Sequence, residues 1–281
     1  MITDEADEMF EAIILGIIQG LTEFLPISSS AHIRLAGEFF PNAVDPGAKF
    51  TAITQIGTEL AVLIYFRKDI LRIVSVWISS LKNKSARNQD SRMGWLIIIG
   101  SIPIVVIGYL AQDFITKELR SLWIIASMMV GFGLILGAAD RFGAKNRELS
   151  QLNVKHGVLY GLAQSLALIP GVSRSGSTIA MGRFLGYSRE AALRYSFLLA
   201  LPAVFGSGLY ELKSAISDNQ VAVYSLPETL VATAIAFVIG YIVIAWLLKF
   251  VTTKSFAPFI IYRVLLGTTV LVLLATGVLQ P

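Results

Sequence analysis

The sequence predicts an all-α integral membrane protein, with about six transmembrane helices and two re-entrant helical hairpins in an inverted repeat. Three observations support this fold class. Of 281 residues, 55% are hydrophobic and 15% charged, with a mean hydropathy of +0.69, whereas soluble domains carry about 25% charged residues. Apolar stretches recur without a long polar block between them, and serine-rich segments containing proline or glycine interrupt two of them. We expect residues 1–281 to form a single membrane-embedded domain.

Charge and cysteine content exclude several other classes. The chain has 23 Lys and Arg against 19 Asp and Glu, and no cysteine. The basic residues lie in short loops between apolar segments, so we expect no nucleic-acid partner. Disulfides, thiolate metal sites and cysteine nucleophiles are excluded. The acidic N-terminus argues against a signal peptide.

Six segments approach the roughly 20 apolar residues that a helix needs to cross a bilayer. They are residues 48–66, 94–111, 122–139, 193–212, 229–250 and 257–279. Two further apolar runs, 9–25 continued by 31–40 and 154–169 continued by 179–185, are each cut by a polar break. Broken helices persist at membrane depth only when they pack in protein or line a polar cavity. These two runs are therefore expected to form re-entrant hairpins.

The basic residues predict the orientation. If segment 48–66 runs from outside to inside, the residues after it form a basic cytoplasmic loop, and in all sixteen Lys and Arg residues fall on the cytoplasmic side and five outside. This bias is a strong positive-inside signal. The first hairpin would then enter from the outer face and the second from the cytoplasmic face.

A shift of 145 residues aligns parts of the two halves, which run roughly from 9 to 140 and from 154 to 279. It places Gly16 on Gly161, Gln19 on Gln164, Ser28 on Ser173 and Ser30 on Ser175. Each half would hold one hairpin and three spans, so the second copy would be inverted. Inverted repeats whose broken helices meet at the midplane are typical of membrane sites in which helix N-termini face anions.

The first break combines a carboxylate, hydroxyls and an imidazole. Gln19 and Glu23 are four residues apart and share a helix face, and Pro26 follows. The run Ser28, Ser29, Ser30 then opens a second half-helix that carries His32, as N-cap chemistry favours. Helix capping would require only one of these serines, so we interpret the segment as a functional site.

The second break reads Pro170-Gly171-Val172-Ser173-Arg174-Ser175-Gly176-Ser177-Thr178. A helix N-terminus with hydroxyls and an arginine fork is suited to an anion, phosphate above all. Arg174 is predicted to lie deep in the membrane, where an ionisable residue is a functional-site candidate.

Three other polar residues lie in the predicted spans. Glu59 and Gln55 repeat the spacing of Glu23 and Gln19, and they either line the same cavity or serve as structural hydrogen-bond partners. Arg263, six residues into the last span, is expected to reach the cytoplasmic surface with its side chain.

Both breaks resemble the signature motifs of the undecaprenyl-diphosphate phosphatase family, the bacitracin-resistance phosphatases of bacterial membranes. Residues Gln19, Glu23, Pro26, Ser28, Ser29 and His32 fit the first motif, with glutamine at its variable leading position. Residues Pro170, Gly171, Ser173, Arg174, Ser175 and Thr178 fit the second without a gap. The resemblance extends over essentially the whole chain.

The resemblance implies hydrolysis of undecaprenyl diphosphate to undecaprenyl phosphate, which recycles the lipid carrier of wall synthesis and confers bacitracin resistance. It also implies a multi-pass protein of the bacterial cytoplasmic membrane, a site facing the outer side, dimers, membrane lipid as a partner, and help from a divalent cation, Mg²⁺ or Ca²⁺. No organic cofactor is expected.

We assign catalytic roles to Glu23, Ser29, His32 and Arg174 as hypotheses. Ser29 would attack with His32 as general base and Glu23 orienting it; alternatively His32 itself attacks or activates a water. Phosphate would be bound by Ser28, Ser30, Ser173, Arg174, Ser175 and Thr178. Glu23 and Gln19 are candidate cation ligands. The competing class is a polyprenyl-phosphate transporter or flippase that uses the same anion pocket.

Overall fold

The computed structural model describes residues 2–40, 45–143, 146–217 and 223–280, and the regular secondary structure of these residues is helical apart from one isolated bridge between Arg147 and Tyr187. The helices are α1 (Ile2–Thr22), α2 (Ser29–Gly37), α3 (Gly47–Tyr65), α4 (Arg67–Lys82), α5 (Gln89–Leu110), α6 (Gln112–Lys117), α7 (Leu122–Phe142), α8 (Val154–Ser165), α9 (Arg174–Phe184), α10 (Arg189–Ser217), α11 (Leu226–Thr253) and α12 (Ala257–Ala275), with short 3₁₀ turns at Lys84–Ala86, Leu149–Gln151 and Leu166–Leu168.

Five of the described helices are long and apolar enough to cross a membrane: α5, α7, α10, α11 and α12. They coincide with five of the six predicted spans, although α5, α7, α10 and α11 are longer than predicted and α12 is shorter. The sixth prediction, residues 48–66, coincides with helix α3, which is not among the five. Its sequence includes Lys49, Gln55 and Glu59, and these residues interrupt the kind of long apolar stretch that each of the five contains.

Both predicted breaks separate two helices. The first lies between α1 and α2, and the second between α8 and α9, where the turn Leu166–Leu168 precedes the break. Helix α1 begins seven residues before the predicted apolar run, because it includes the acidic N-terminal residues.

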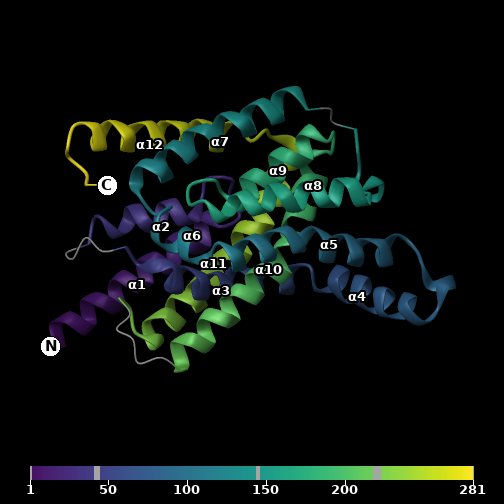
Figure 1. Ribbon diagram of the computed structural model, residues 1–281, viewed down its shortest axis with the longest axis horizontal. Coiled ribbons are helices and arrows are strands. Elements are labelled where there is room, and N and C mark those ends of the chain that lie inside the picture. The colour runs from purple at the N-terminus through teal and green to yellow at the C-terminus, as the bar shows by residue number, and fades with distance from the viewer. Residues whose placement is uncertain (1, 41–44, 144–145, 218–222, 281) are drawn as a thin grey trace.

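Helix α4 was not expected, because the residues after position 66 were predicted to form a basic cytoplasmic loop. Its apolar residues recur at helical spacing, and Leu71, Val74, Ile78 and Leu81 are exposed. Helix α4 packs along α5 (Figure 1). An apolar stripe beside basic residues is typical of a helix that lies at a membrane surface.

The helices pack as two related groups that surround α9 and the break before α2. Helix α1 packs on α11, and α8 packs on α5. A Cβ on Gly16 would lie 2.6 Å from the Ala232 oxygen, and one on Gly161 would lie 2.3 Å from the Gly100 oxygen. Glycine permits these close crossings, as is usual between membrane helices. Helices α7 and α12 form a separate pair along one edge of the molecule (Figure 1).

Candidate active site

The two breaks have matching backbone geometry. Ser28 and Ser173 precede α2 and α9, and among the described residues they are the two non-glycine residues with positive φ, 74° and 71°. The Oγ of Ser28 lies 3.2 Å from that of Ser30, and the Oγ of Ser173 lies 3.2 Å from that of Ser175. Such strained backbone conformations cluster at functional sites.

The serines differ in how they cap their helices. Ser173 accepts a hydrogen bond from the Gly176 N–H at 3.1 Å, whereas Ser28 makes no side-chain cap bond. The Ser175 hydroxyl donates to the Leu25 carbonyl at 3.1 Å and thereby joins the two breaks. The N-termini of α2 and α9 therefore lie at one site, and their N–H groups favour an anion.

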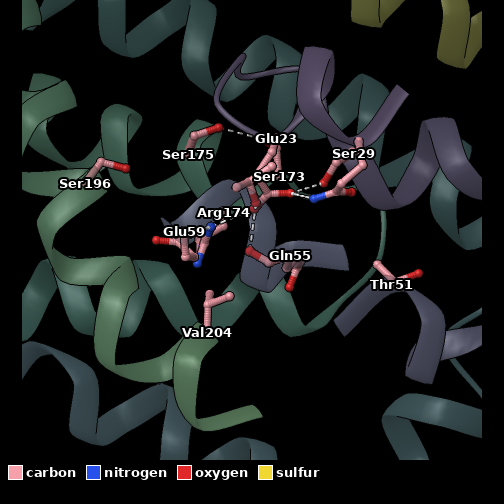
Figure 2. A network of polar contacts seen from close by, with 12 residues as sticks. Glu23, Ser29, Thr51, Gln55, Glu59, Ser173, Arg174, Ser175, Ser196 and Val204 are labelled. Carbon is pink, nitrogen blue, oxygen red and sulfur yellow. Dashed lines mark hydrogen bonds and ion pairs between the residues drawn. The ribbon is translucent and has the colours of Figure 1, made fainter. Parts of the chain in front are cut away.

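Glu23 is the central residue of the site (Figure 2). Its Oε2 accepts hydrogen bonds from the Ser29 hydroxyl at 2.5 Å and from Gln19 Nε2 at 2.8 Å. Its Oε1 accepts from Arg174 Nη2 at 2.6 Å. Glu23 thus contacts two other predicted site residues, Ser29 and Arg174, which come from different breaks.

Arg174 is bound by two carboxylates. Its Nη2 donates to Glu23 and also to Glu59 Oε1, at 2.5 Å (Figure 2). Glu59 lies on α3 and is fully buried. Glu59 therefore contacts a predicted site residue, a result that fits both alternatives left open by the sequence, lining the same cavity and serving as a structural hydrogen-bond partner.

His32 lies apart from Ser29. Its Nδ1 is 2.7 Å from the Ser28 carbonyl oxygen and its Nε2 is 2.8 Å from the Tyr262 hydroxyl, with the two rings stacked 5.6 Å apart. Within the described part of the chain, the Ser29 hydroxyl is bonded to Glu23 and not to His32. His32, the expected general base, therefore lies next to the serine run, but the residue that contacts the Ser29 hydroxyl is Glu23.

Thr178 is fully buried and anchors α9. Its Oγ1 donates to the Arg174 carbonyl at 2.7 Å and lies 2.5 Å from the hydroxyl of Ser196 on α10. These contacts hold the helix whose first residue is Arg174. Thr178 therefore supports the site by fixing the first turn of α9 against α10.

Arg263 does not reach the surface, so the expectation from sequence is wrong. The side chain is completely buried and donates to the carbonyl oxygens of Pro26, Met128, Met129, Gly171 and Val172 at 2.7 to 3.4 Å. Pro26 belongs to the first break, and Gly171 and Val172 belong to the second. The hydrogen bonds to these carbonyl oxygens offset the cost of burying the guanidinium, so the side chain stays inside the protein and does not extend to the surface.

Sequence reasoning missed Tyr262 and the roles of Arg263 and Glu59, because their partners lie more than 90 positions away. The signal available was that each places a polar group inside an apolar helix, which is costly unless the group is paired.

The described residues contain no group of three or more His, Cys, Asp or Glu side chains arranged to hold a metal ion. Gln19 Oε1 has no hydrogen-bond partner and lies on the side chain that contacts Glu23. Mg²⁺ commonly uses one or two protein oxygens together with substrate phosphates. Gln19 and Glu23 fit that limited role, not a cage made only of protein ligands.

The fold and the site define a class: a multi-pass helical membrane protein with a buried cluster of polar and charged side chains between two helix breaks. The chain belongs to the family described as bacitracin resistance protein BacA, whose sequence model matches residues 12–269. An undecaprenyl-diphosphatase of Paenarthrobacter aurescens is 60% identical over 272 residues, which cover 96% of this chain and 98% of the relative. An undecaprenyl-diphosphatase of Micrococcus luteus is also 60% identical, over 96% and 98% of the two chains. Undecaprenyl-diphosphatase 2 of Streptomyces coelicolor is 55% identical over 97% of each.

Proposed function

We propose that this chain hydrolyses undecaprenyl diphosphate to undecaprenyl phosphate and phosphate, and so recycles the lipid carrier of cell-wall synthesis and confers bacitracin resistance. Relatives that bear the name undecaprenyl-diphosphatase match almost the full chain at 55 to 60% identity. The observation that carries the proposal is the contact of the Ser29 hydroxyl with Glu23 beside Arg174. This arrangement supplies a nucleophile, a proton acceptor and a phosphate-binding cation in one buried place.

In the proposed mechanism, Arg174 and the N-termini of α2 and α9 hold the diphosphate. Ser29 Oγ attacks the terminal phosphorus while Glu23 takes its proton. The bond from that phosphorus to the bridging oxygen breaks, and undecaprenyl phosphate leaves with the bridging oxygen, which takes the proton from Glu23. Water then attacks the phosphoserine while Glu23 accepts a proton from the water, and Glu23 returns this proton to Ser29 Oγ as the bond between Oγ and phosphorus breaks and phosphate is released. Positioning and charge stabilisation supply most of the catalysis in phosphoryl transfer.

His32 retains two possible roles in this scheme. Through Ser28 and Tyr262 it holds the backbone before α2 in place. The alternative in which His32 attacks, or activates a water, predicts a phosphohistidine or no covalent intermediate at all. Rapid quenching with a radiolabelled prenyl diphosphate, followed by peptide mapping, distinguishes these routes, and we expect the label on Ser29.

The activity itself is tested by phosphate release from undecaprenyl diphosphate by the purified protein in detergent. We expect wild type to be active and Ser29→Ala, Arg174→Ala and His32→Ala to lose at least 100-fold in kcat/KM, a range that loss of a catalytic group commonly produces. A transporter that does not hydrolyse would release no phosphate in any of these proteins. The names of the relatives favour hydrolysis over transport.

We also propose that a divalent cation binds with the diphosphate and is contacted by Gln19 and Glu23. Such an ion offsets the negative charge of the substrate. If a chelator leaves the activity of the purified protein unchanged, this role is excluded.

For the arrangement in the membrane, we propose six spans, with α3 as the sixth, and two re-entrant hairpins, α1–α2 from the outer side and α8–α9 from the cytoplasmic side. The site would then face the outer side of the bacterial cytoplasmic membrane. We propose a homodimer as the functional unit, which the mass of the protein in native nanodiscs would test.

A further inference from the structure

Glu59 is a buried acid on α3, outside both signature motifs. None of its side chain is exposed, and its Oε2 has no hydrogen-bond partner. The charged groups that face it are Arg174 and Glu23. A carboxylate at this depth is costly unless it serves the site.

The two terminal nitrogens of the Arg174 guanidinium differ in their hydrogen bonds. Nη2 carries two hydrogens and makes two bonds, to Glu23 at 2.6 Å and to Glu59 at 2.5 Å. Nη1 is buried and has no partner. The two carboxylates therefore hold the guanidinium by one nitrogen and leave both hydrogens of the other available, which is the edge that a phosphate oxygen requires.

Packing alone does not require an acid at this place. The 145-residue shift that aligns Ser28 with Ser173 also aligns Glu59 with Val204 of α10 (Figure 2). Val204 is buried, and α3 and α10 pack against each other. An aliphatic side chain thus satisfies the corresponding position in the other half of the chain.

From these contacts we infer that Glu59 is a positioning residue, which fixes the guanidinium of Arg174 through Nη2 so that Nη1 is free to bind the diphosphate. The inference rests on the proposed function, because it assigns Arg174 to the substrate. Without Glu59, the guanidinium would be held by Glu23 alone and could turn its free edge away from the phosphate.

A double-mutant cycle tests whether Glu59 acts through Arg174. The four proteins are wild type, Glu59→Val, Arg174→Lys and the double variant. Isothermal titration with a methylene-bridged farnesyl diphosphonate, which is not hydrolysed, gives each dissociation constant. We expect Glu59→Val to weaken binding 10- to 100-fold in the wild-type background and less than threefold in the Arg174→Lys background, because lysine has no fork to orient.

Two single variants separate this role from packing. Glu59→Gln keeps an acceptor oxygen and is expected to weaken binding less than fivefold. Glu11→Gln is the matched control, because Glu11 is buried and bonded to Tyr224 at 2.9 Å and lies about 18 Å from Glu23 along α1. We expect its binding and turnover to equal those of wild type.

Equal losses in both backgrounds would show that Glu59 only packs, and unchanged or tighter binding in Glu59→Val would show that it does not position Arg174. Either result overturns the inference while wild-type phosphate release upholds the proposed function. A wild-type protein that releases no phosphate from undecaprenyl diphosphate would overturn both.

Discussion

At the residue scale, Arg263 connects more of the site than any single motif residue. Its guanidinium holds the carbonyl of Pro26 before α2 and those of Gly171 and Val172 before α9, together with two carbonyls of α7. The carbonyl groups in these breaks have no helical hydrogen bonds and need other donors. Arg263 on α12 supplies these donors, and so it fixes the two breaks relative to each other.

We predict that Arg263→Met lowers the free energy of unfolding by about 3 kcal/mol or more, since buried carbonyls left without donors cost about 1–3 kcal/mol each. Phosphate release should fall more than tenfold at temperatures where the variant is still folded, because the two breaks would no longer be held together. Thermal unfolding in detergent and a phosphate assay measure these effects.

Arg263→Lys should lie between wild type and Arg263→Met, since lysine has three hydrogens to donate. Arg141→Lys, on an exposed residue of α7, is the control and should change neither quantity. A folded, fully active Arg263→Met would rule out this role.

At the element scale, an ion-pair cluster outside the apolar helices joins four parts of the chain. Arg120, between α6 and α7, donates from Nε to Asp45 at 2.6 Å, and the Gly47 N–H at the start of α3 donates to Asp45 at 2.9 Å. Arg34 of α2 lies 3.8 Å from the same carboxylate. Burial alone would raise the pKa of Asp45, but the hydrogen bonds and charge of Arg120 outweigh it, with help from Gly47 and Arg34, so the pKa lies below its ordinary value of 3.8.

A carboxylate whose pKa is lower when folded adds stability above its unfolded pKa and loses it as the pH falls through the folded pKa. We predict that Asp45→Asn reduces the free energy of unfolding by about 1–2 kcal/mol at pH 7. The difference between variant and wild type should persist down to about pH 4 and disappear below the folded pKa. Denaturation in detergent at a series of pH values measures it. Glu118→Gln, on an exposed residue, should show no such difference, and a gap that is the same at every pH would contradict the assignment.

The sequence predicted elements and motif contacts for different reasons. Glu23, Ser29 and Arg174 could be brought together because each flanks a polar break in an apolar run, and the two breaks were expected to meet. The contact between Glu59 and Arg174 could not be predicted, because the two residues are 115 positions apart. Apolar periodicity does not tell which helices pack together around the site. Helix α4 was missed because its basic residues were counted as a loop, although Leu71, Val74 and Ile78 recur every three or four residues, a helical spacing.

At the scale of the whole molecule, the two halves repeat their pairings. Helix α1 packs on α11 of the other half, and α8 packs on α5 of the first half. Each half therefore packs against helices of the other. The site therefore lies among helices of both halves. The side of the membrane from which substrate enters the site depends on how the whole chain is oriented.

The orientation can be measured directly, because the chain has no cysteine and any introduced thiol is unique. Ser85, in the turn after α4, and Gln280, after α12, are both exposed. The excess of basic residues predicts that Ser85 is cytoplasmic and Gln280 outside. We expect a membrane-impermeant maleimide to label Gln280→Cys in intact cells, and Ser85→Cys only after permeabilisation. Phosphate release by both variants should match wild type, which would show that the labelled proteins are folded.

The reverse labelling pattern would invert the topology and place the site on the cytoplasmic side, where the recycling role proposed for the outer face would be impossible. Labelling of both positions from outside would instead require an odd change in the number of spans between them, with the hairpin α8–α9 as the element to reassign to a span.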